Sequence, residues 1–174
     1  MPKQDAIALL KQDHAAVKRL FEQEGKLGKQ ADEKKEFIFK QIKAALEVHA
    51  TIEEEIFYPA VKKARSEHVK DEVREGYEEH KQIKALLAQI SNITPADETY
   101  DMKVKVLKED VEHHVKDEEG EMFPDAKKFL GESQLMELGA KMGARKEQLE
   151  KHSRPKPENQ PSTRLKVILP KGEI

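Results

Sequence analysis

The chain repeats one pattern of polar residues at helical spacing, and this repeat restricts the folds that it can adopt. Three residues recur 65 positions later, and a histidine near the start recurs 66 positions later. The matched pairs are His49 with His114, Glu53 with Glu118, Pro59 with Pro124, and His14 with His80. Each copy has one histidine on a first segment, then His-x-x-x-Glu on a second segment that runs into an aromatic residue and a proline. The sequence therefore predicts two copies of one helix pair.

The repeated polar residues lie on stripes that are otherwise apolar. Apolar side chains recur at steps of three and four residues in four segments, which is the spacing of one helix face. The stripes are Ile7, Leu10, Val17 and Phe21; Ile38, Ile42, Leu46 and Ile56; Val73, Ile83, Leu87 and Ile90; and Val104, Leu107, Val111 and Met122. Because residues i and i+4 share a helix face, His-x-x-x-Glu is expected to point both side chains into a core.

Helix-breaking and helix-capping residues set the expected limits of the helices. The second helix should kink at Pro59. In "SNITPADE", Thr94, Pro95 and Asp97 match an N-cap, a first-turn proline and a capping acid, which predicts that the fourth helix begins there. We expect a helical bundle in residues 1–131, a short fifth helix that forms a lid or a dimer contact in residues 132–152, and an irregular Pro-rich tail in residues 153–174.

Length and composition favour a single all-α domain. A chain of 174 residues can bury one core of ordinary size and carry a tail. Hydrophobic residues make up 37%, charged residues 38% and aromatic residues 5%, which is typical of amphipathic helices with solvated outer faces rather than of β-sandwiches.

Charge and cysteine content exclude several classes of function. The formal net charge of −2 predicts no nucleic-acid partner and no anionic membrane surface as a partner. The absence of cysteine excludes disulfides, thiolate-bound zinc and iron–sulfur clusters, so any metal must be bound by nitrogen and oxygen. No apolar run is long enough for a signal peptide or a membrane span, and we expect a cytoplasmic protein.

Four imidazoles and two carboxylates at core positions point to bound metal. An unpaired buried carboxylate is costly, and metal ions are the simplest replacement for the lost solvation. Four nitrogens and two bridging carboxylates fill about eight of the roughly twelve positions of two six-coordinate ions, which leaves room for oxo, hydroxo, water or a small ligand. Nitrogen and oxygen donors without thiolate favour two iron ions, although manganese or zinc could occupy the site in vitro.

The six residues resemble the hemerythrin-like (HHE cation-binding) domains in order and spacing, and the flanking "FYP" and "MFP" also fit. The resemblance covers roughly residues 5 to 130. It implies an up-down-up-down four-helix bundle with a non-heme di-iron centre. The implied terminal ligands are His14, His49, His80 and His114, and the implied bridges are Glu53 and Glu118. Members of this family carry or sense oxygen, bind nitric oxide, sense iron, or turn over peroxide.

The chain departs from the oxygen-carrying hemerythrins at two positions. Those proteins have a further histidine four residues before the one on helix three, where this chain has Gly76. They also have an aspartate five residues after the histidine on helix four, where this chain has Glu119, and Glu118 is the expected bridge. The loss of an imidazole and its bulk at Gly76 predicts a more accessible iron. Tyr77 is expected to coordinate iron, to donate a hydrogen bond to a bound oxygen species, or to serve only in packing.

Two classes of function remain open. The first is an enzyme that decomposes hydrogen peroxide, which Gly76 and Tyr77 favour. The second is a non-enzymatic sensor or store of oxygen, nitric oxide or iron, which fits the lack of a recognisable electron-transfer domain. The expected partners are therefore oxygen, hydrogen peroxide or nitric oxide, and a homodimer remains open.

The remaining histidines and acids near the pattern are expected to be solvated. This set comprises His68, His113, His152, Glu54, Glu55, Asp117 and Glu121. Asp13 and Glu79 each precede a predicted ligand, but adjacent helical positions point apart, so exposed charges are expected there. A ferritin-like site would need glutamate at positions that here are Leu46 and Val111, which excludes it.

Overall fold

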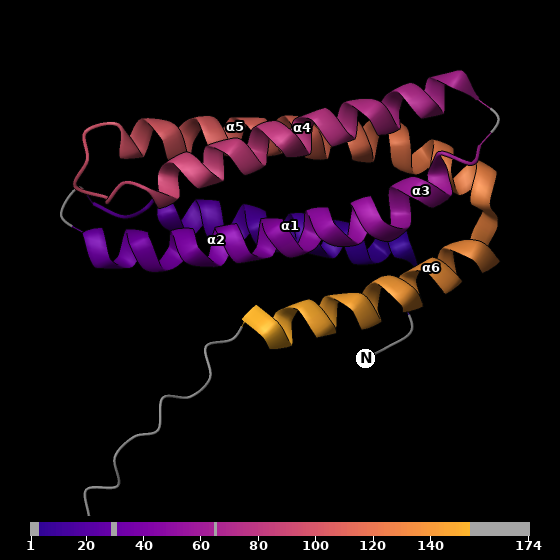
Figure 1. The fold of residues 1–174 in the computed structure, drawn as a ribbon, viewed down its shortest axis with the longest axis horizontal. Helices are drawn as coiled ribbons and strands as arrows, with labels where there is room; N and C mark the ends of the chain where they lie inside the picture. Colours follow the sequence, from indigo (N-terminus) through magenta and orange to yellow (C-terminus); the bar gives the residue numbers. More distant parts are fainter. Residues whose placement is uncertain (1–3, 29–30, 65, 154–174) are drawn as a thin grey trace, which may run out of the picture.

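Four long helices lie side by side and run alternately up and down in the computed structural model (Figure 1). They are α1 (Ala6–Glu24), α2 (Asp32–Ile52), α4 (Glu67–Ser91) and α5 (Tyr100–Asp117). The structure describes residues 4–28, 31–64 and 66–153, with side chains as far as Lys151. The predicted all-α bundle is confirmed, whereas the predicted tail lies almost wholly outside the described residues.

Two helices pass through a widened turn at the repeated glutamates. Helix α2 continues into the π-helical turn η1 (Glu53–Phe57) and α3 (Tyr58–Val61), and α5 continues into η2 (Glu118–Met122) and α6 (Phe123–Ser153). In each turn a backbone N–H bonds the glutamate carbonyl five residues back: Tyr58 to Glu53, and Phe123 to Glu118. The proline that follows has no N–H for the usual bond four residues back. The predicted kink is therefore a widened turn just before each proline.

The first helix begins at a side-chain cap, whereas the fourth begins later than the sequence predicted. Asp5 caps α1, and its carboxylate accepts the N–H of Ala8 at 2.9 Å. The predicted start of the fourth helix at Thr94 is wrong, because α5 begins at Tyr100. Asp97 instead accepts the backbone N–H and the hydroxyl of Thr99 at 2.8 and 2.6 Å. This local turn satisfies the carboxylate without starting a helix.

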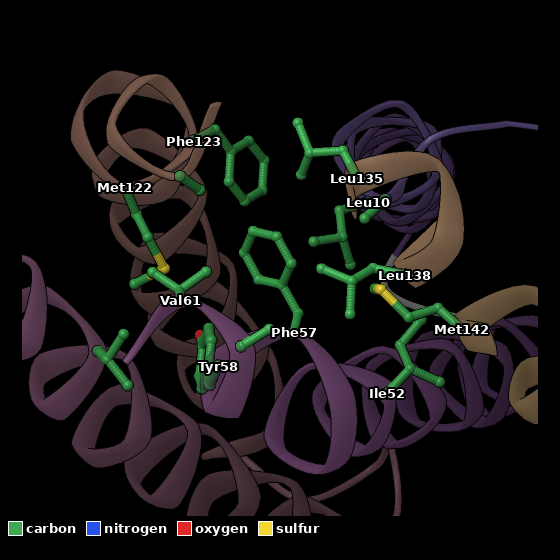
Figure 2. Close-up of a cluster of buried hydrophobic side chains, with 14 of the residues drawn as sticks. Leu10, Ile52, Phe57, Tyr58, Val61, Met122, Phe123, Leu135, Leu138 and Met142 are labelled. Carbon is green, nitrogen blue, oxygen red and sulfur yellow. The ribbon is translucent and has the colours of Figure 1, made fainter. Parts of the chain in front are cut away.

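Helix α6 turns back on the bundle at Gly131, whose φ of 71° favours glycine. The segment after this break packs along α1 and α2 (Figure 1). Leu135, Leu138 and Met142 form its buried stripe, in contact with the apolar ends of the bundle helices (Figure 2). The apolar face of the predicted fifth helix therefore covers this chain's own core.

The buried apolar side chains form two clusters with a polar layer between them. One cluster lies where α6 covers the bundle and includes Leu10, Ile52 and Phe57 (Figure 2). The other includes Phe21 and Leu107 and fills the opposite half of the bundle. No helix among the described residues is long and apolar enough to cross a membrane.

Candidate metal centre

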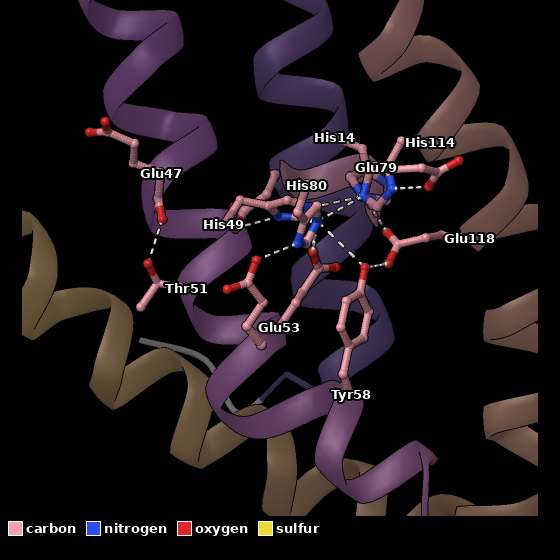
Figure 3. Close-up of polar contacts among 12 residues, drawn as sticks. His14, Glu47, His49, Thr51, Glu53, Tyr58, Glu79, His80, His114 and Glu118 are labelled. Atoms are coloured by element: carbon pink, nitrogen blue, oxygen red, sulfur yellow. Dashed lines mark hydrogen bonds and ion pairs between the residues drawn. The ribbon is translucent and has the colours of Figure 1, made fainter. Parts of the chain in front are cut away.

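The six residues predicted from the repeat meet in the polar layer of the bundle (Figure 3). One comes from each of α1 and α4, two come from α2 with η1, and two come from α5 with η2. All six are buried, with exposed fractions between 0% for Glu53 and 6% for His14. The widened turns position the two glutamates at the end of α2 and of α5.

The imidazole Nε2 atoms face one another in two pairs, and the carboxylates join the pairs. His14 and His49 have their Nε2 atoms 3.2 Å apart, and so do His80 and His114. Oε2 of Glu53 lies 3.2 Å from Nε2 of both His49 and His80. Oε2 of Glu118 lies 3.2 Å from Nε2 of His14 and 3.5 Å from that of His114. Each carboxylate therefore touches one imidazole of each pair.

Each imidazole also faces a second carboxylate through Nδ1, on the side away from the centre. These contacts are His14 with Glu119 at 2.9 Å, His49 with Asp13 at 3.7 Å, His80 with Glu54 at 2.9 Å, and His114 with Glu79 at 2.8 Å. The expectation that Asp13, Glu79 and Glu54 are simply exposed is wrong. Asp13 is 8% exposed and held by Lys146 of α6, and the Glu54 side chain is 26% exposed and held by Lys84. Sequence reasoning overlooked this carboxylate set.

The outer carboxylates determine which ring nitrogen carries the proton. A carboxylate accepts a hydrogen bond, so a neutral imidazole beside it carries its proton on Nδ1, as in His14, His80 and His114. Nδ1 of His49 lies 3.7 Å from Asp13 and has no hydrogen-bond partner. Where both rings of a pair are neutral, their Nε2 atoms present lone pairs toward each other at 3.2 Å. Two facing lone pairs repel unless a cation lies between them. Two nitrogens bound at right angles to one ion, each ~2.1 Å from it, would lie ~3.0 Å apart, which matches this spacing.

The pKa values reflect how crowded this buried layer is. Burial lowers the pKa of His49, and it lowers that of His80 to about 2, so both rings are neutral. Burial and then the nearby Glu118 raise the pKa of Glu53 well above its usual value. Burial would raise the pKa of Glu118 too, but the imidazoles of His114 and His14 outweigh it and lower that pKa. Burial thus favours the protonated form of Glu53, whereas the imidazoles favour the charged form of Glu118.

Several polar atoms of the cluster lack the hydrogen bonds that burial normally demands. Both carboxylate oxygens of Glu53 and Oε2 of Glu118 have no hydrogen-bond partner. His14, His49, Glu53 and Glu118 form one group with ligand atoms within 4.8 Å of one another, and Glu53, His80 and His114 form another. Orphaned oxygens and converging lone pairs fit a pair of metal ions that share Glu53.

Tyr58 is the tyrosine at the cluster, and the sequence did not indicate it. Its hydroxyl donates to Oε1 of Glu118 at 2.8 Å and lies 3.4 Å from Nε2 of His80 (Figure 3). The hydroxyl of Tyr77 instead donates to the backbone oxygen of Glu54 at 3.3 Å, and its ring packs edge-on against Tyr58. Burial raises the pKa of Tyr58 well above its usual value, so the phenol is protonated.

Gly76 allows Tyr58 to approach the cluster closely. A Cβ atom at Gly76 would lie 2.6 Å from the hydroxyl of Tyr58 and 2.9 Å from its ring carbon Cζ. The phenol therefore occupies the place that a side chain at Gly76 would fill, and Gly76 also lines a cavity of about 100 Å³ that includes Glu118. The other expected surface residues His68 and His113 are exposed, as predicted.

A pocket reaches the cluster from the side of α1 and α5. Its volume is about 490 Å³, and its lining includes His14, Phe21, Val111 and Val115. The equivalent space between α2 and α4 has a volume of about 10 Å³. A small molecule can therefore approach the His14 side of the cluster more readily than the His80 side.

The family model of the hemerythrin HHE cation binding domain matches residues 5–126 of this chain. The chain belongs to this family. A crystal structure of a hemerythrin HHE cation binding domain-containing protein from Mycobacterium kansasii has the same fold, with a TM-score of 0.75 and 25% identity, over 86% of this chain and 89% of that one. This hemerythrin-domain protein thus has the bundle of a cation-binding family, and its His/Glu cluster has suitable donors for metal ions.

Two sequence relatives differ in how much of their length the chain covers. A protein named DNA nickase from Nostoc sp. (strain PCC 7120 / SAG 25.82 / UTEX 2576) is 31% identical over 143 residues, which are 82% of this chain and 39% of that protein. An uncharacterized protein from Mycobacterium tuberculosis (strain ATCC 25618 / H37Rv) is 28% identical over 146 residues, which are 83% of this chain and 87% of that protein. The chain thus spans well under half of the Nostoc protein and most of the mycobacterial one.

Proposed function

We propose that this hemerythrin-domain protein is a non-heme di-iron protein that binds and decomposes hydrogen peroxide. The terminal ligands are His14, His49, His80 and His114, and the bridging ligands are Glu53 and Glu118. The observation that carries this proposal is the pairing of Nε2 atoms at 3.2 Å, each on an imidazole whose Nδ1 faces a carboxylate. Four such imidazoles and two carboxylates packed together are electrostatically unfavourable without cations, and their donor atoms suit two metal ions.

Iron is proposed because of the donor atoms. Imidazole and carboxylate without thiolate, gathered in the core of a helical bundle, form the donor set of di-iron centres. Manganese and zinc accept the same donors, so they could occupy the site in vitro by affinity alone. The near-neutral charge of the chain supports the proposal that it has no nucleic-acid or membrane partner. A cytoplasmic location is also proposed.

Bound iron would supply a redox couple that oxidises one hydrogen peroxide to dioxygen and reduces a second to two waters. The chain's own side chains provide access, exclusion of water and hydrogen bonding. The pocket beside His14 supports access for a small molecule. The Tyr58 hydroxyl, 2.8 Å from Glu118, supplies a protonated hydrogen-bond donor beside the bridging carboxylate.

A peroxide assay on the iron-loaded protein tests this proposal. Oxygen evolution that survives repeated additions of hydrogen peroxide, and that is lost in Glu53→Ala, is the expected result. Bleaching of the iron absorption without turnover would reject the enzyme and favour the second candidate, a non-enzymatic sensor or store of oxygen, nitric oxide or iron. The sensor or store is supported by the position of Tyr77, whose hydroxyl donates to the backbone oxygen of Glu54 rather than pointing to the cluster.

A nuclease function has less support. The name DNA nickase applies to a Nostoc protein of which this chain spans 39%. The net charge of −2 offers little attraction for a phosphate backbone. A gel-shift experiment at low salt should therefore detect no binding to duplex DNA.

A further inference from the structure

A second cavity approaches the cluster within the second copy of the repeat, and most of the residues that line it are acidic. The cleft lies between α4 and the end of α5 with η2, and its volume is about 100 Å³. Its carboxylates are Glu72, Glu75, Glu79, Asp117, Glu118 and Glu121. No lysine or arginine is among the residues that line it. Because Glu118 is one of the proposed bridging ligands, the cleft connects the surface with the metal centre.

Glu72 is buried in this cleft without a hydrogen-bond partner. Its exposed fraction is 7%, and neither carboxylate oxygen makes a hydrogen bond. The nearest basic group is Nε2 of His68, 3.6 Å from Oε1 and one helical turn away. A buried carboxylate in this state is costly, and a cation in the cleft would offset the cost.

Neighbouring side chains complete sets of donors around the cleft. The ligand atoms of His68, Glu72 and Glu121 all lie within 4.8 Å of one another at the mouth. Glu79, His113 and Asp117 form a second such group beside the cleft, in which the side chain of His113 is 67% exposed. Both sets offer imidazole nitrogen and carboxylate oxygen, which suit a divalent transition-metal cation.

The repeat provides a control for this arrangement within the molecule. In the first copy, the positions equivalent to the cleft residues Glu72, Glu75, Asp117 and Glu121 are Ala6, Leu9, Ile52 and Ile56. Those residues are apolar and belong to the core that α6 covers. Exposure to solvent explains why this face is polar. It does not explain why its charged residues are all acidic in a chain with 32 basic and 34 acidic residues, or why Glu72 is buried.

We propose that this acidic cleft is the route by which a divalent cation reaches the metal centre, with His68, Glu72 and Glu121 holding the ion at the mouth. Successive carboxylates along the wall replace the water shell of the ion in steps, until Glu118 passes it to the centre. This inference rests on the proposed function for the destination of the ion. The mouth site itself does not depend on what the centre catalyses.

The rate of iron uptake tests the route. Metal-free protein is mixed with Fe²⁺ without oxygen, samples are quenched with a chelator at set times, and the iron retained after desalting is counted. Glu72→Gln combined with Glu121→Gln keeps the shape of both side chains and removes both charges. Uptake should slow by about tenfold or more, with the same final iron content. Glu78→Gln combined with Glu109→Gln, two exposed acids outside the cleft, should take up iron at the wild-type rate.

The two proposals fail in different ways in this experiment. An equal uptake rate in the cleft variant and the wild type would overturn the route, whereas a wild-type chain that retains no iron would overturn the metal centre. The mouth site is measured separately by Mn²⁺ binding, read from the free-ion EPR signal, in His49→Ala/His114→Ala protein. Weak Mn²⁺ binding that disappears when Glu72→Gln and Glu121→Gln are added supports the mouth site, and unchanged binding contradicts it.

Discussion

On its outer side, each imidazole of the cluster faces a carboxylate from another helical element. Asp13 lies beside His14 in the sequence, yet it faces His49. Glu79 precedes His80 but bonds His114. Adjacent residues on a helix point about 100° apart, so an acid next to a ligand faces the neighbouring helix. This geometry fixes the rings and keeps the Nε2 lone pairs directed inward.

Removal of one outer carboxylate should weaken metal binding without disturbing the fold. Glu54→Gln takes away the charge 2.9 Å from Nδ1 of His80. The affinity of the chain for metal should fall about 10- to 100-fold, because the ring becomes a poorer donor and is less well oriented. Glu47→Gln on the same helix is a suitable control, because its side chain is 54% exposed. Equal affinities for the two variants, measured by competition with a chelator, would contradict the role given to Glu54.

The close fit of Tyr58 against Gly76 predicts a coupled pair of mutations. Tyr58→Phe removes the donor to Glu118, and the metal-free chain should lose about 1–3 kcal/mol of unfolding free energy. Gly76→Ala should also destabilise, because its Cβ would lie 2.6 Å from the hydroxyl of Tyr58. The cost of Gly76→Ala should be smaller in the Tyr58→Phe background, where that oxygen is absent. Urea denaturation of the four proteins measures this coupling, and strictly additive costs would argue against the contact.

The sequence predicted the six inner residues but not the outer ones. The inner six interrupt apolar stripes, so their burial could be read from the spacing alone. The outer acids lie among exposed residues, where a charge is unremarkable. A signal was nevertheless present, since Asp13 and Glu79 are 66 positions apart, and Glu54 and Glu119 are 65 apart. Acids that recur in the register of the ligands could have been recognised as part of the site.

The widened turns explain why Tyr58 escaped prediction. In a regular helix the residues three and four after Glu53 share its face, which places Ile56 on the inner stripe. The π-helical turn adds one residue, so Phe57 and Tyr58 are fully buried and Ile56 only partly. Helical periodicity carries no information about such an insertion. The prolines did mark its position, although they predicted a kink rather than a widened turn.

The packing of α6 on α1 depends on one glycine and can be tested with a matched pair of variants. A Cβ at Gly139 would lie 2.1 Å from the backbone oxygen of Gln4 and 2.8 Å from the backbone nitrogen of Ala6. Backbone cannot move aside easily, so Gly139→Ala should lower the unfolding free energy by about 1–3 kcal/mol. A Cβ at Gly143 would meet only a side-chain atom of Leu9 at 3.8 Å. Gly143→Ala should therefore be neutral or stabilising by up to about 1 kcal/mol.

Thermal unfolding of the two alanine variants distinguishes these outcomes. A lower melting temperature for Gly139→Ala and an equal or higher one for Gly143→Ala is expected. Similar melting temperatures would contradict the close crossing of α6 over the start of α1.

Across the whole molecule, the two copies of the repeat share one centre but differ in their surroundings. The first copy turns apolar residues toward α6, and the second turns acids toward a cleft. The pocket beside His14 adds a further difference between the two sides. The repeat itself was evident in the sequence, whereas the loss of symmetry was not, because it depends on which face α6 covers.

The buried imidazoles predict that the metal-free chain is sensitive to acid. His49 and His80 have lowered pKa values, that of His80 falling to about 2, so the folded chain binds fewer protons than the unfolded chain below pH 6.5. Stability is therefore lost as the pH falls through that range. The raised pKa values of Glu53, Glu72 and Glu24 act in the opposite direction, because these carboxyls bind protons more readily in the folded chain.

The wild type should therefore lose more stability between pH 6.5 and 4.5 than His80→Gln, which lacks one of these imidazoles. Urea midpoints of the two metal-free proteins, measured at several pH values across this range, test this difference. The same dependence on pH in both proteins would mean that the imidazole is not held neutral by burial.

The metal content of the chain is the most direct test of the central claim. Wild-type protein and Glu53→Ala are loaded with Fe²⁺ without oxygen and desalted, and the iron per chain is measured for both. The shared carboxylate at Glu53 predicts about two irons for the wild type and fewer than one for the variant. No retained iron in the wild type, or the same content in both proteins, would contradict a di-iron centre built on these six residues.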